Sequence, residues 1–241
     1  MSFKVIGLNV QSGGKNILTN ISFTLGAGEV ITILGSNGAG KSELVLGIAG
    51  VLKIGAGQVV VDGTDITAKS PDIVRAAGVA VVPEGHKVLT QLTVDENLRA
   101  AGSLRWHDIE ANLHKTYERF PELADRKTQL AGTLSGGQQQ MVALGHALMS
   151  APKYLVIDEM SLGLAPLIVK RLFGVVHELQ SQGVGIVIIE QFTDLALGVA
   201  DHAVVLRGGR DKYNGPADIL LANPEQLDEA YFGTGHKRTM T

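Results

Sequence analysis

One short segment constrains this chain more than any other. Residues 35–42 read Gly-Ser-Asn-Gly-Ala-Gly-Lys-Ser and fit the pattern G-x-x-x-x-G-K-[ST]. The segment follows an apolar run at 30–34 and precedes a helix-like stretch at 44–49, which is the strand–loop–helix context that the pattern requires. Glycines let backbone N–H groups turn inward toward an anion, and the start of a helix adds the positive end of its dipole. The segment therefore predicts a phosphate-binding loop and, with it, a nucleotide ligand.

The polar positions of this loop have candidate roles. Lys41 can reach β- and γ-phosphates, and the Ser42 hydroxyl can ligate Mg²⁺. A chance match in a glycine-rich chain would arise at odds on the order of one in a hundred, and the strand–helix context makes it rarer. The predicted nucleotide-binding residues of the loop are Gly35, Ser36, Asn37, Gly38, Ala39, Gly40, Lys41, Ser42 and Glu43.

A pair of carboxylates follows the apolar run at 154–157. We expect Asp158 to hold Mg²⁺, directly or through water, and Glu159 to polarise an attacking water. Because the two residues are adjacent, strand alternation should direct their carboxylates differently. On its own the pair could be a solvated turn, so the phosphate loop is what favours the metal-and-base interpretation.

A second glycine-rich segment, Leu134-Ser135-Gly136-Gly137-Gln138, precedes a helical pattern at 138–149. A Ser hydroxyl and Gly N–H groups at a helix N-terminus form donors for an anion, which predicts a second anion site at Ser135, Gly136, Gly137 and Gln138. The plainer alternative is a glycine turn that Ser135 caps.

These segments occur in the order found in one family. The Leu134–Gln138 segment resembles the signature motif of ABC-type ATPases, residues 154–159 resemble its Walker B strand with the catalytic glutamate, and residues 161–165 resemble its D-loop. The resemblance covers nearly the whole chain and implies an ATPase that uses ATP and Mg²⁺. In this family the signature of one subunit covers the γ-phosphate bound by the other. A second ATPase subunit, identical or a paralogue, is therefore expected in a head-to-tail dimer.

Some positions depart from the usual family pattern. Ser12 stands where most relatives have an aromatic that stacks on adenine, and Met160 stands where Walker B usually continues with Pro. Glu84 stands where relatives carry a Gln that senses the γ-phosphate and Mg²⁺, and a carboxylate is a reasonable ligand for this ion. The predicted metal ligands are Ser42, Glu84 and Asp158.

Gln191 stands where most relatives carry a switch His. An amide can donate a hydrogen bond to a γ-phosphate but carries no charge. The alternative is that Gln191 caps a helix beginning around Thr193. The predicted catalytic residues are Glu159, Gln191 and Lys41.

The departures themselves resemble one branch of the family. Pro83-Glu84-Gly85 and Glu190-Gln191 are typical of ATPase subunits of high-affinity branched-chain amino-acid importers, and residues 161–166 and 230–233 fit the smaller of the two ATPase subunits. This resemblance implies a subunit that powers import of branched-chain or related amino acids through integral membrane permease subunits. An extracytoplasmic solute-binding protein would act indirectly, and the chain would sit at the cytoplasmic face of the inner (plasma) membrane.

Two alternative functions remain open at this point. One is a soluble ABC ATPase that serves an assembly or repair complex, and the other is a nucleotide-binding regulatory module with little hydrolysis. The missing aromatic and the missing His favour the regulatory module, whereas Glu159 argues against it. Neighbouring permease and binding-protein genes would distinguish an importer from an assembly complex.

Composition and patterning set the fold class. The chain has 241 residues, a net charge of −3 and no cysteine, so it offers no electrostatic case for nucleic acid and no disulfide. No apolar stretch reaches the 18 or so residues of a membrane helix, and a cytosolic protein is expected. Strands are predicted at 3–10, 21–25, 58–61, 78–82, 184–189 and 202–207, with a helix from Pro166 to about Gly183 and a mobile tail after Gly233.

Together these patterns predict one α/β domain, residues 1–241, with the core of a P-loop NTPase. We expect a mostly parallel sheet, an N-terminal antiparallel β part and a helical subdomain inserted at approximately 85–150.

Overall fold

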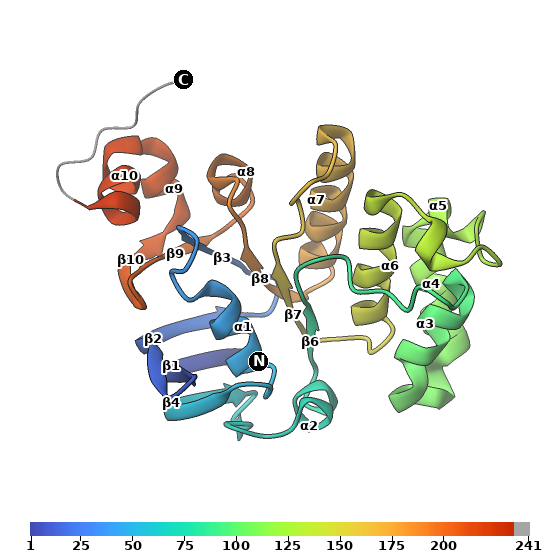
Figure 1. Ribbon diagram of the computed structural model, residues 1–241, viewed down its shortest axis with the longest axis horizontal. Coiled ribbons are helices and arrows are strands. Elements are labelled where there is room, and N and C mark those ends of the chain that lie inside the picture. Colours follow the sequence, from blue (N-terminus) through green and yellow to red (C-terminus); the bar gives the residue numbers. More distant parts are fainter. Residues whose placement is uncertain (234–241) are drawn as a thin grey trace.

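The computed structural model describes residues 1–233, apart from the side chains of residues 104–106. The tail after Gly233 that the sequence predicts to be mobile lies outside the described residues. Two sheets, and helices on either side of the larger one, make up the molecule (Figure 1). This arrangement is the α/β fold that the sequence predicts.

The smaller sheet is antiparallel, with strand order β2-β1-β4-β5. Its strands are β1 (Ser2–Ser12), β2 (Lys15–Gly26), β4 (Lys53–Val61) and β5 (Thr64–Asp65). A hairpin turn at Asp62-Gly63 joins β4 to β5, with φ of 50° and 84° at the two turn residues. The predicted strand at 21–25 is too short, because residues 15–20, in which polar residues flank Ile17 and Leu18, also belong to the strand and pair with β1.

The larger sheet has strand order β10-β9-β3-β8-β7-β6. Neighbours from β9 to β6 are parallel, and β10 pairs antiparallel with β9 at the edge. Every residue of β3, β7 and β8 is buried, as expected of central parallel strands covered on both faces. The strands are β3 (Val30–Gly35), β6 (Val79–Val82), β7 (Tyr154–Asp158), β8 (Gly185–Ile189), β9 (His202–Arg207) and β10 (Arg210–Pro216).

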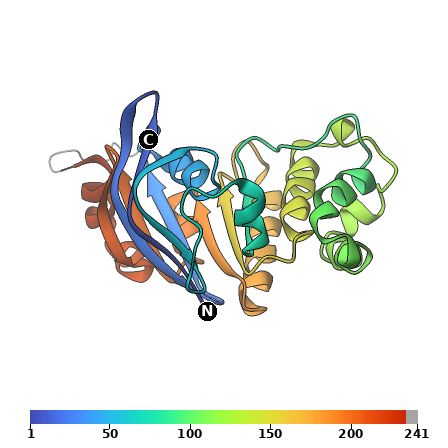
Figure 2. The ribbon, with the colours of Figure 1, turned by 90° about the horizontal axis from the view of Figure 1, so that it is seen from below.

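Helices cover both faces of this sheet (Figures 1 and 2). One apolar core lies between the two sheets and includes α1, and a second lies between the larger sheet and the helices α3 to α7. The α-helices are α1 (Lys41–Ile48), α2 (Pro71–Ala76), α3 (Val94–Gly102), α4 (Ile109–Arg119), α5 (Pro121–Ala124), α6 (Gly136–Leu148), α7 (Pro166–Ser181), α8 (Thr193–Leu197), α9 (Ala217–Ala222) and α10 (Pro224–Phe232). Among the residues described, no helix has the length and apolarity to cross a membrane.

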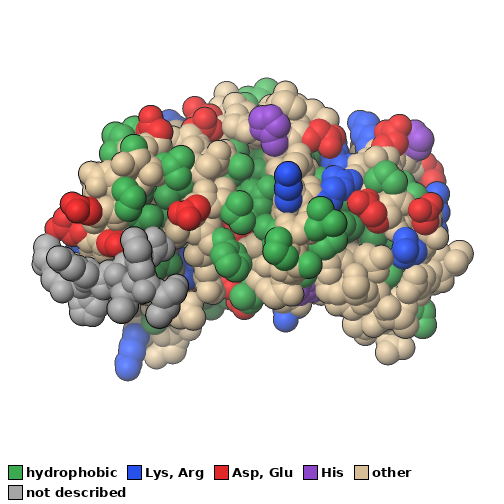
Figure 3. Space-filling model, turned by 90° about the horizontal axis from the view of Figure 1, so that it is seen from above, with side chains coloured by type: hydrophobic (Ala, Val, Ile, Leu, Met, Phe, Trp, Pro, Cys, Tyr) green, Lys and Arg blue, Asp and Glu red, His purple; other side chains and the backbone are tan. Residues whose placement is uncertain are grey.

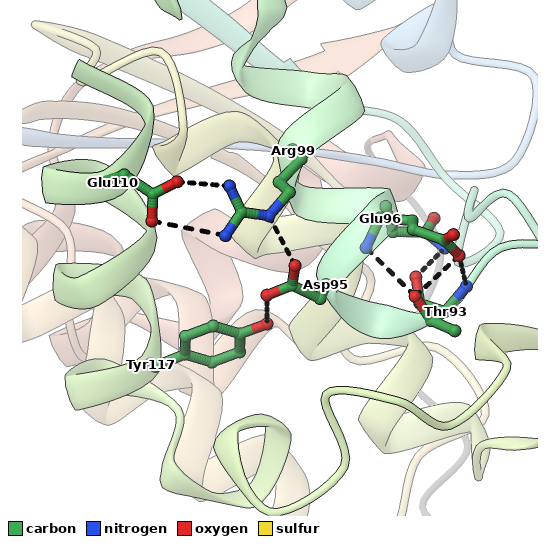
Figure 4. A network of polar contacts seen from close by, with 7 residues as sticks. Thr93, Asp95, Glu96, Arg99, Glu110 and Tyr117 are labelled. Atoms are coloured by element: carbon green, nitrogen blue, oxygen red, sulfur yellow. Dashed lines mark hydrogen bonds and ion pairs between the residues drawn. The ribbon is translucent and has the colours of Figure 1, made fainter. Parts of the chain in front are cut away.

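The chain between β6 and β7 is helical and extends away from the two sheets (Figure 2). Helix α3 begins with a capping box, in which the Glu96 N–H donates to Thr93 Oγ1 and the Thr93 N–H donates to Glu96 Oε2. Arg99 on α3 binds Asp95 on its own helix at 2.6 Å and Glu110 on α4 at 2.5 Å (Figure 4). These contacts hold α3 and α4 together. The boundary of a subdomain at 85–150 stays a prediction.

Candidate functional site

The loop between β3 and α1 is built around glycines that no larger residue could replace. A Cβ on Gly35 would lie 2.5 Å from the Leu206 carbonyl oxygen, and one on Gly40 would lie 2.5 Å from Leu18 Cδ2. Gly38 and Gly40 also have positive φ, 78° and 102°, which L side chains disfavour. Gly40 is the N-cap of α1, so the loop presents its backbone at a helix N-terminus. This geometry suits an anion.

Lys41, the first residue of α1, is 5% exposed, and its ammonium lies over the loop. Lys41 Nζ donates to the carbonyl oxygens of Gly35 at 2.8 Å and Ser36 at 3.3 Å. It also lies 4.0 Å from Glu159 Oε1. The ammonium thus sits between the loop and the end of β7, where it can exchange carbonyl ligands for phosphate oxygens.

A cavity of about 450 Å³ opens beside this loop. It brings together side chains that follow β3, β6, β7 and β8, all at the carboxyl ends of parallel strands, where ligands of open α/β sheets bind. No aromatic side chain is among the described residues that line it. Its lining residues are Asn37, Gly38, Gly40, Lys41, Ser42, Glu43, Glu84, Glu159, Leu162 and Gln191.

Asp158, the last residue of β7, is 3% exposed and lies behind this lining. Its Oδ1 is buried without a hydrogen-bond partner among the described residues. The pKa of Asp158 is raised to about 6, chiefly by burial and also by the nearby Glu159 and Glu84 carboxylates, while a hydrogen bond from the Ser42 hydroxyl and the charge of Lys41 act in the opposite direction. Asp158 is therefore a desolvated carboxylate with a free oxygen, an arrangement that suits a bound cation.

Glu159 leaves β7 in a strained conformation. Its φ is +50°, in the left-handed region that residues other than glycine rarely occupy. The Glu159 N–H donates to the Ile189 carbonyl at 2.9 Å, and Glu159 Oε1 accepts from Gln191 Nε2 at 2.8 Å. The adjacent carboxylates of Asp158 and Glu159 thus reach different partners.

Gln191 does not cap the helix that follows it. Helix α8 has Phe192 as its N-cap, with no side-chain capping bond, and the Gln191 amide reaches Glu159 instead. The alternative of a helix-capping Gln191 is therefore wrong. The amide lies at the mouth of the cavity and keeps its position through the carboxylate it binds.

The glycine-rich segment before α6 lies outside this cavity. Ser135 Oγ accepts from the Gln138 N–H at 3.4 Å, and the Gln138 side chain accepts from the Ser135 N–H at 3.1 Å, which completes a capping box. A Cβ on Gly137 would lie 2.8 Å from Ile168 Cγ2, so this glycine permits α6 to pack against α7. Within one chain the segment is a capped helix start, separate from the phosphate loop.

Two residues of this region have no site role in the sequence analysis. Leu162 lines the cavity, and Glu190, 1% exposed, binds Ser161 through its carboxylate. Leu162 falls in the segment 161–165 that resembles the D-loop, but this resemblance gives its side chain no role of its own. The sequence signal for Glu190 is a charged residue directly after a fully apolar strand.

Comparison with known proteins gives consistent matches. The family model of the ABC transporter matches residues 18–161. The chain is 41% identical over 222 residues to the high-affinity branched-chain amino acid transport ATP-binding protein BraG of Pseudomonas aeruginosa, covering 92% of this chain and 95% of that protein. It is 32% identical to the probable branched-chain amino acid transport ATP-binding protein LivF of Archaeoglobus fulgidus, covering 95% and 98%.

Solved structures agree with these relatives. An ATP-binding cassette of an ABC transporter in its ADP conformation superposes with a TM-score of 0.84 at 29% identity, covering 95% of this chain and 98% of that one. A nucleotide-free cassette from an ABC transporter gives 0.82 at 29% identity, with the same coverage.

Proposed function

Because this chain belongs to the ABC transporter family, we propose that it hydrolyses ATP to power the import of branched-chain or related amino acids through a partner membrane permease. The observation that carries the proposal is the convergence of Lys41, Glu159 and Gln191 on one cavity beside the phosphate loop. The 41% identity to a branched-chain amino acid transport protein supports the choice of solute.

The side chains of the cavity suit hydrolysis of a phosphoanhydride. The loop N–H groups and Lys41 would bind the β- and γ-phosphates, which places the γ-phosphorus next to Glu159. Glu159 would accept the proton of the attacking water, and Gln191 would hold the carboxylate toward that water. In this role the lysine leaves the Gly35 and Ser36 carbonyls for the phosphate oxygens.

The residues present fit Mg²⁺. Asp158 supplies a buried oxygen with no other partner, Ser42 lies next to it, and Glu84 lines the same cavity. Among the residues described, no three His, Cys, Asp or Glu side chains form a metal cage, which agrees with an ion that takes its remaining ligands from phosphates and water. The bound ion would supply charge neutralisation for the phosphates. Without a cation, the four carboxylates Glu43, Glu84, Asp158 and Glu159 around one lysine would repel ATP.

A second ATPase subunit would complete the site. Ser135–Gln138 lies outside the cavity of its own chain, so we propose that this segment meets the γ-phosphate of another copy or a paralogue in a head-to-tail dimer. Hydrophobic side chains gather in the middle of the face seen in Figure 3. An apolar groove between α7 and α8, with the exposed Phe192 and Leu195 in its lining, supports such a contact.

The dimer can be tested by sedimentation of the purified chain. Glu159→Gln should form a dimer with ATP and Mg²⁺ because it binds ATP without consuming it, and should remain monomeric with ADP. Ser135→Arg in the same background should abolish the ATP-dependent dimer. A monomer under all conditions, alone and with any ATPase encoded beside it, would contradict the head-to-tail arrangement.

The permease would dock where the helical part meets the core. A groove of about 200 Å³ between α2, β6 and α6 is lined by Pro71, Val74, Arg75 and His146, and β6 leads from it to Glu84. Nucleotide-driven movement of the helices would pull on a permease segment held there, and the solute-binding protein would act on the other side of the membrane. Cross-links from cysteines placed at 85–100 to cytoplasmic permease loops would support this; contacts confined to 215–235 would contradict it.

Uptake measurements test the proposed function as a whole. In cells lacking this gene, we expect the wild-type chain to restore uptake of radiolabelled leucine and Glu159→Gln to fail while being expressed at the same level. Uptake of an unrelated sugar is the control. Unchanged leucine, isoleucine and valine uptake in the deletion strain, together with copurification of a soluble assembly complex, would favour the alternative of a non-transport ATPase.

A further inference from the structure

The Glu190 side chain makes a contact that the function described so far does not use. Glu190 directly follows β8 and is buried. Its Oε1 accepts from the Ser161 backbone N–H at 3.0 Å, and its Oε2 accepts from the Ser161 hydroxyl at 2.5 Å. Both oxygens of one carboxylate therefore hold one residue, at the start of the loop that connects β7 to α7.

The register of β7 and β8 explains why this contact lies so close to the cavity. Asp158 pairs with Ile189, and the Glu159 N–H donates to the Ile189 carbonyl at 2.9 Å. The two residues after Ile189 contact the chain that follows β7, one toward the cavity and the other toward the interior. Gln191 reaches Glu159 at the cavity, while Glu190 reaches Ser161 in the interior.

The segment that these contacts hold is strained. Glu159 has a φ of +50°, and such a conformation persists at a non-glycine residue only where surrounding contacts over-determine it. The Ile189 carbonyl fixes Glu159 from one side, and the two bonds from Glu190 to Ser161 fix the chain two residues further on. The next residue, Leu162, lines the cavity.

We propose that Glu190 is a positioning residue for hydrolysis: by holding Ser161 at two points, it keeps Glu159 in the backbone conformation that directs its carboxylate to Gln191. The inference rests on the proposed role of Glu159 as the group that polarises water. A displacement of about 1 Å in a catalytic group can cost about a hundredfold in rate, so a loosened loop should be visible in turnover.

The two hydrogen bonds, and not the charge, do the positioning. In Glu190→Gln the amide oxygen can accept the Ser161 N–H and the amide nitrogen can donate to Ser161 Oγ, so both contacts survive without a carboxylate. In Glu190→Ala both contacts are lost, and in Ser161→Ala only the hydroxyl contact is lost. If the hydrogen bonds matter, turnover should fall in the order Glu190→Gln, Ser161→Ala, Glu190→Ala. If the charge matters, Glu190→Gln should be as slow as Glu190→Ala.

The experiment measures kcat, KM for ATP and Tm on the same preparation of each full-length variant. We expect Glu190→Ala to lower kcat about ten- to hundredfold with KM within about twofold, Ser161→Ala to fall between it and wild type, and Glu190→Gln to stay within about threefold of wild type. Thr116→Val is the matched control, since it removes a buried hydroxyl that bonds the Asn112 carbonyl at 2.8 Å on α4. It should lower Tm without lowering kcat per folded molecule.

Two outcomes would overturn the proposal. Unchanged kcat per folded Glu190→Ala molecule, with only Tm lowered, would make the contact structural. A Glu190→Gln variant as slow as Glu190→Ala would show that the charge matters instead of the hydrogen bonds.

A measurement that does not depend on hydrolysis separates the proposed role of Glu190 from the proposed role of Glu159 in polarising water. The chain contains no cysteine, so Leu162→Cys accepts a single nitroxide label. In the labelled Leu162→Cys protein, Glu190→Ala should increase the mobility of the label and Glu190→Gln should not. Equal mobility in the labelled protein with and without either substitution would contradict the proposal that Glu190 holds this loop through Ser161. Full turnover in Glu159→Gln would show that the proposed role of Glu159 is wrong. If Glu190→Ala still increased the mobility of the label, Glu190 would nevertheless hold the loop through Ser161.

Discussion

Gln191 Nε2 donates a hydrogen bond of 2.8 Å to Glu159 Oε1, across the gap between the segments that follow β8 and β7. The same carboxylate oxygen lies 4.0 Å from Lys41 Nζ. Glu159 is thus held between a neutral amide and an ammonium. The amide carries no charge, so it can orient the carboxylate only by hydrogen bonding.

The first prediction concerns this amide. Gln191→Ala should lower turnover by roughly ten- to a thousandfold, the scale of losing one positioned hydrogen-bond donor. Tm should change little, because the side chain is exposed at the cavity mouth and does not cap α8. ATPase rate and Tm measured on one sample test this, and an unchanged rate rules out the switch role.

Replacement by the residue usual in the family is the matched control. Gln191→His can still donate to Glu159, so it should retain activity. An imidazole titrates near neutral pH and an amide does not, so we expect the rate of Gln191→His to depend on pH between about 6 and 7.5 more steeply than that of wild type.

The second prediction separates binding from chemistry at Glu159. Glu159→Gln should bind ATP as wild type does, because the phosphate loop is untouched, and should lose at least about a hundredfold in turnover, because the water loses its base. Calorimetry gives the affinity, and a coupled phosphate assay gives the rate. Unchanged turnover in the purified transporter complex would defeat the assignment.

The third prediction concerns the loop lysine. Lys41→Ala removes the ammonium that lies over the phosphate loop, so ATP affinity should fall at least about tenfold. Lys69→Ala, which removes an exposed lysine, is the control and should bind ATP normally. Equal affinity of Lys41→Ala and wild type by calorimetry would show that the nucleotide binds elsewhere.

The sequence predicts the central sheet well because fully apolar runs leave few alternatives. The strand expected at 202–207 is β9, and the one expected at 184–189 differs from β8 by one residue. At the edge of the smaller sheet the pattern is less informative, since residues 15–20 of β2 contain four polar residues and yet pair with β1. Edge and surface strands owe their existence to backbone pairing, which residue type reports only weakly.

The same distinction holds at the site. The phosphate loop, Asp158 and Glu159 are adjacent in sequence or carried by a motif, so the sequence can point to them. The contact from Glu190 to Ser161 depends on the register of β7 against β8, which no local pattern specifies. The segment at Ser135 shows the reverse: its motif predicts an anion site, and within one chain its polar groups satisfy each other.

The last prediction concerns pH and lies outside the cavity. His146 on α6 lines the groove beside α2, and its Nε2 is buried without a hydrogen-bond partner among the described residues. Burial, together with the smaller effect of the positive charge on nearby Arg75, lowers the pKa of His146 to about 4. An unfolded histidine titrates near 6.5, so between these values the unfolded chain binds a proton that the folded chain does not.

The sign of the effect follows from this difference. The contribution of His146 to stability is fully present above about pH 6.5 and is lost as pH falls toward 4, by up to about 3 kcal/mol. His146→Gln removes the titrating group, so its free energy of unfolding should fall less than that of wild type between pH 7.5 and 4.5 in urea titrations. His177→Gln, at an exposed position of α7, is the control and should follow the wild-type curve. If the free energy of unfolding of His146→Gln and wild type fell equally between pH 7.5 and 4.5, the imidazole would have to gain its proton in the folded protein as it does in the unfolded chain. The groove would then have to admit water or an acidic partner.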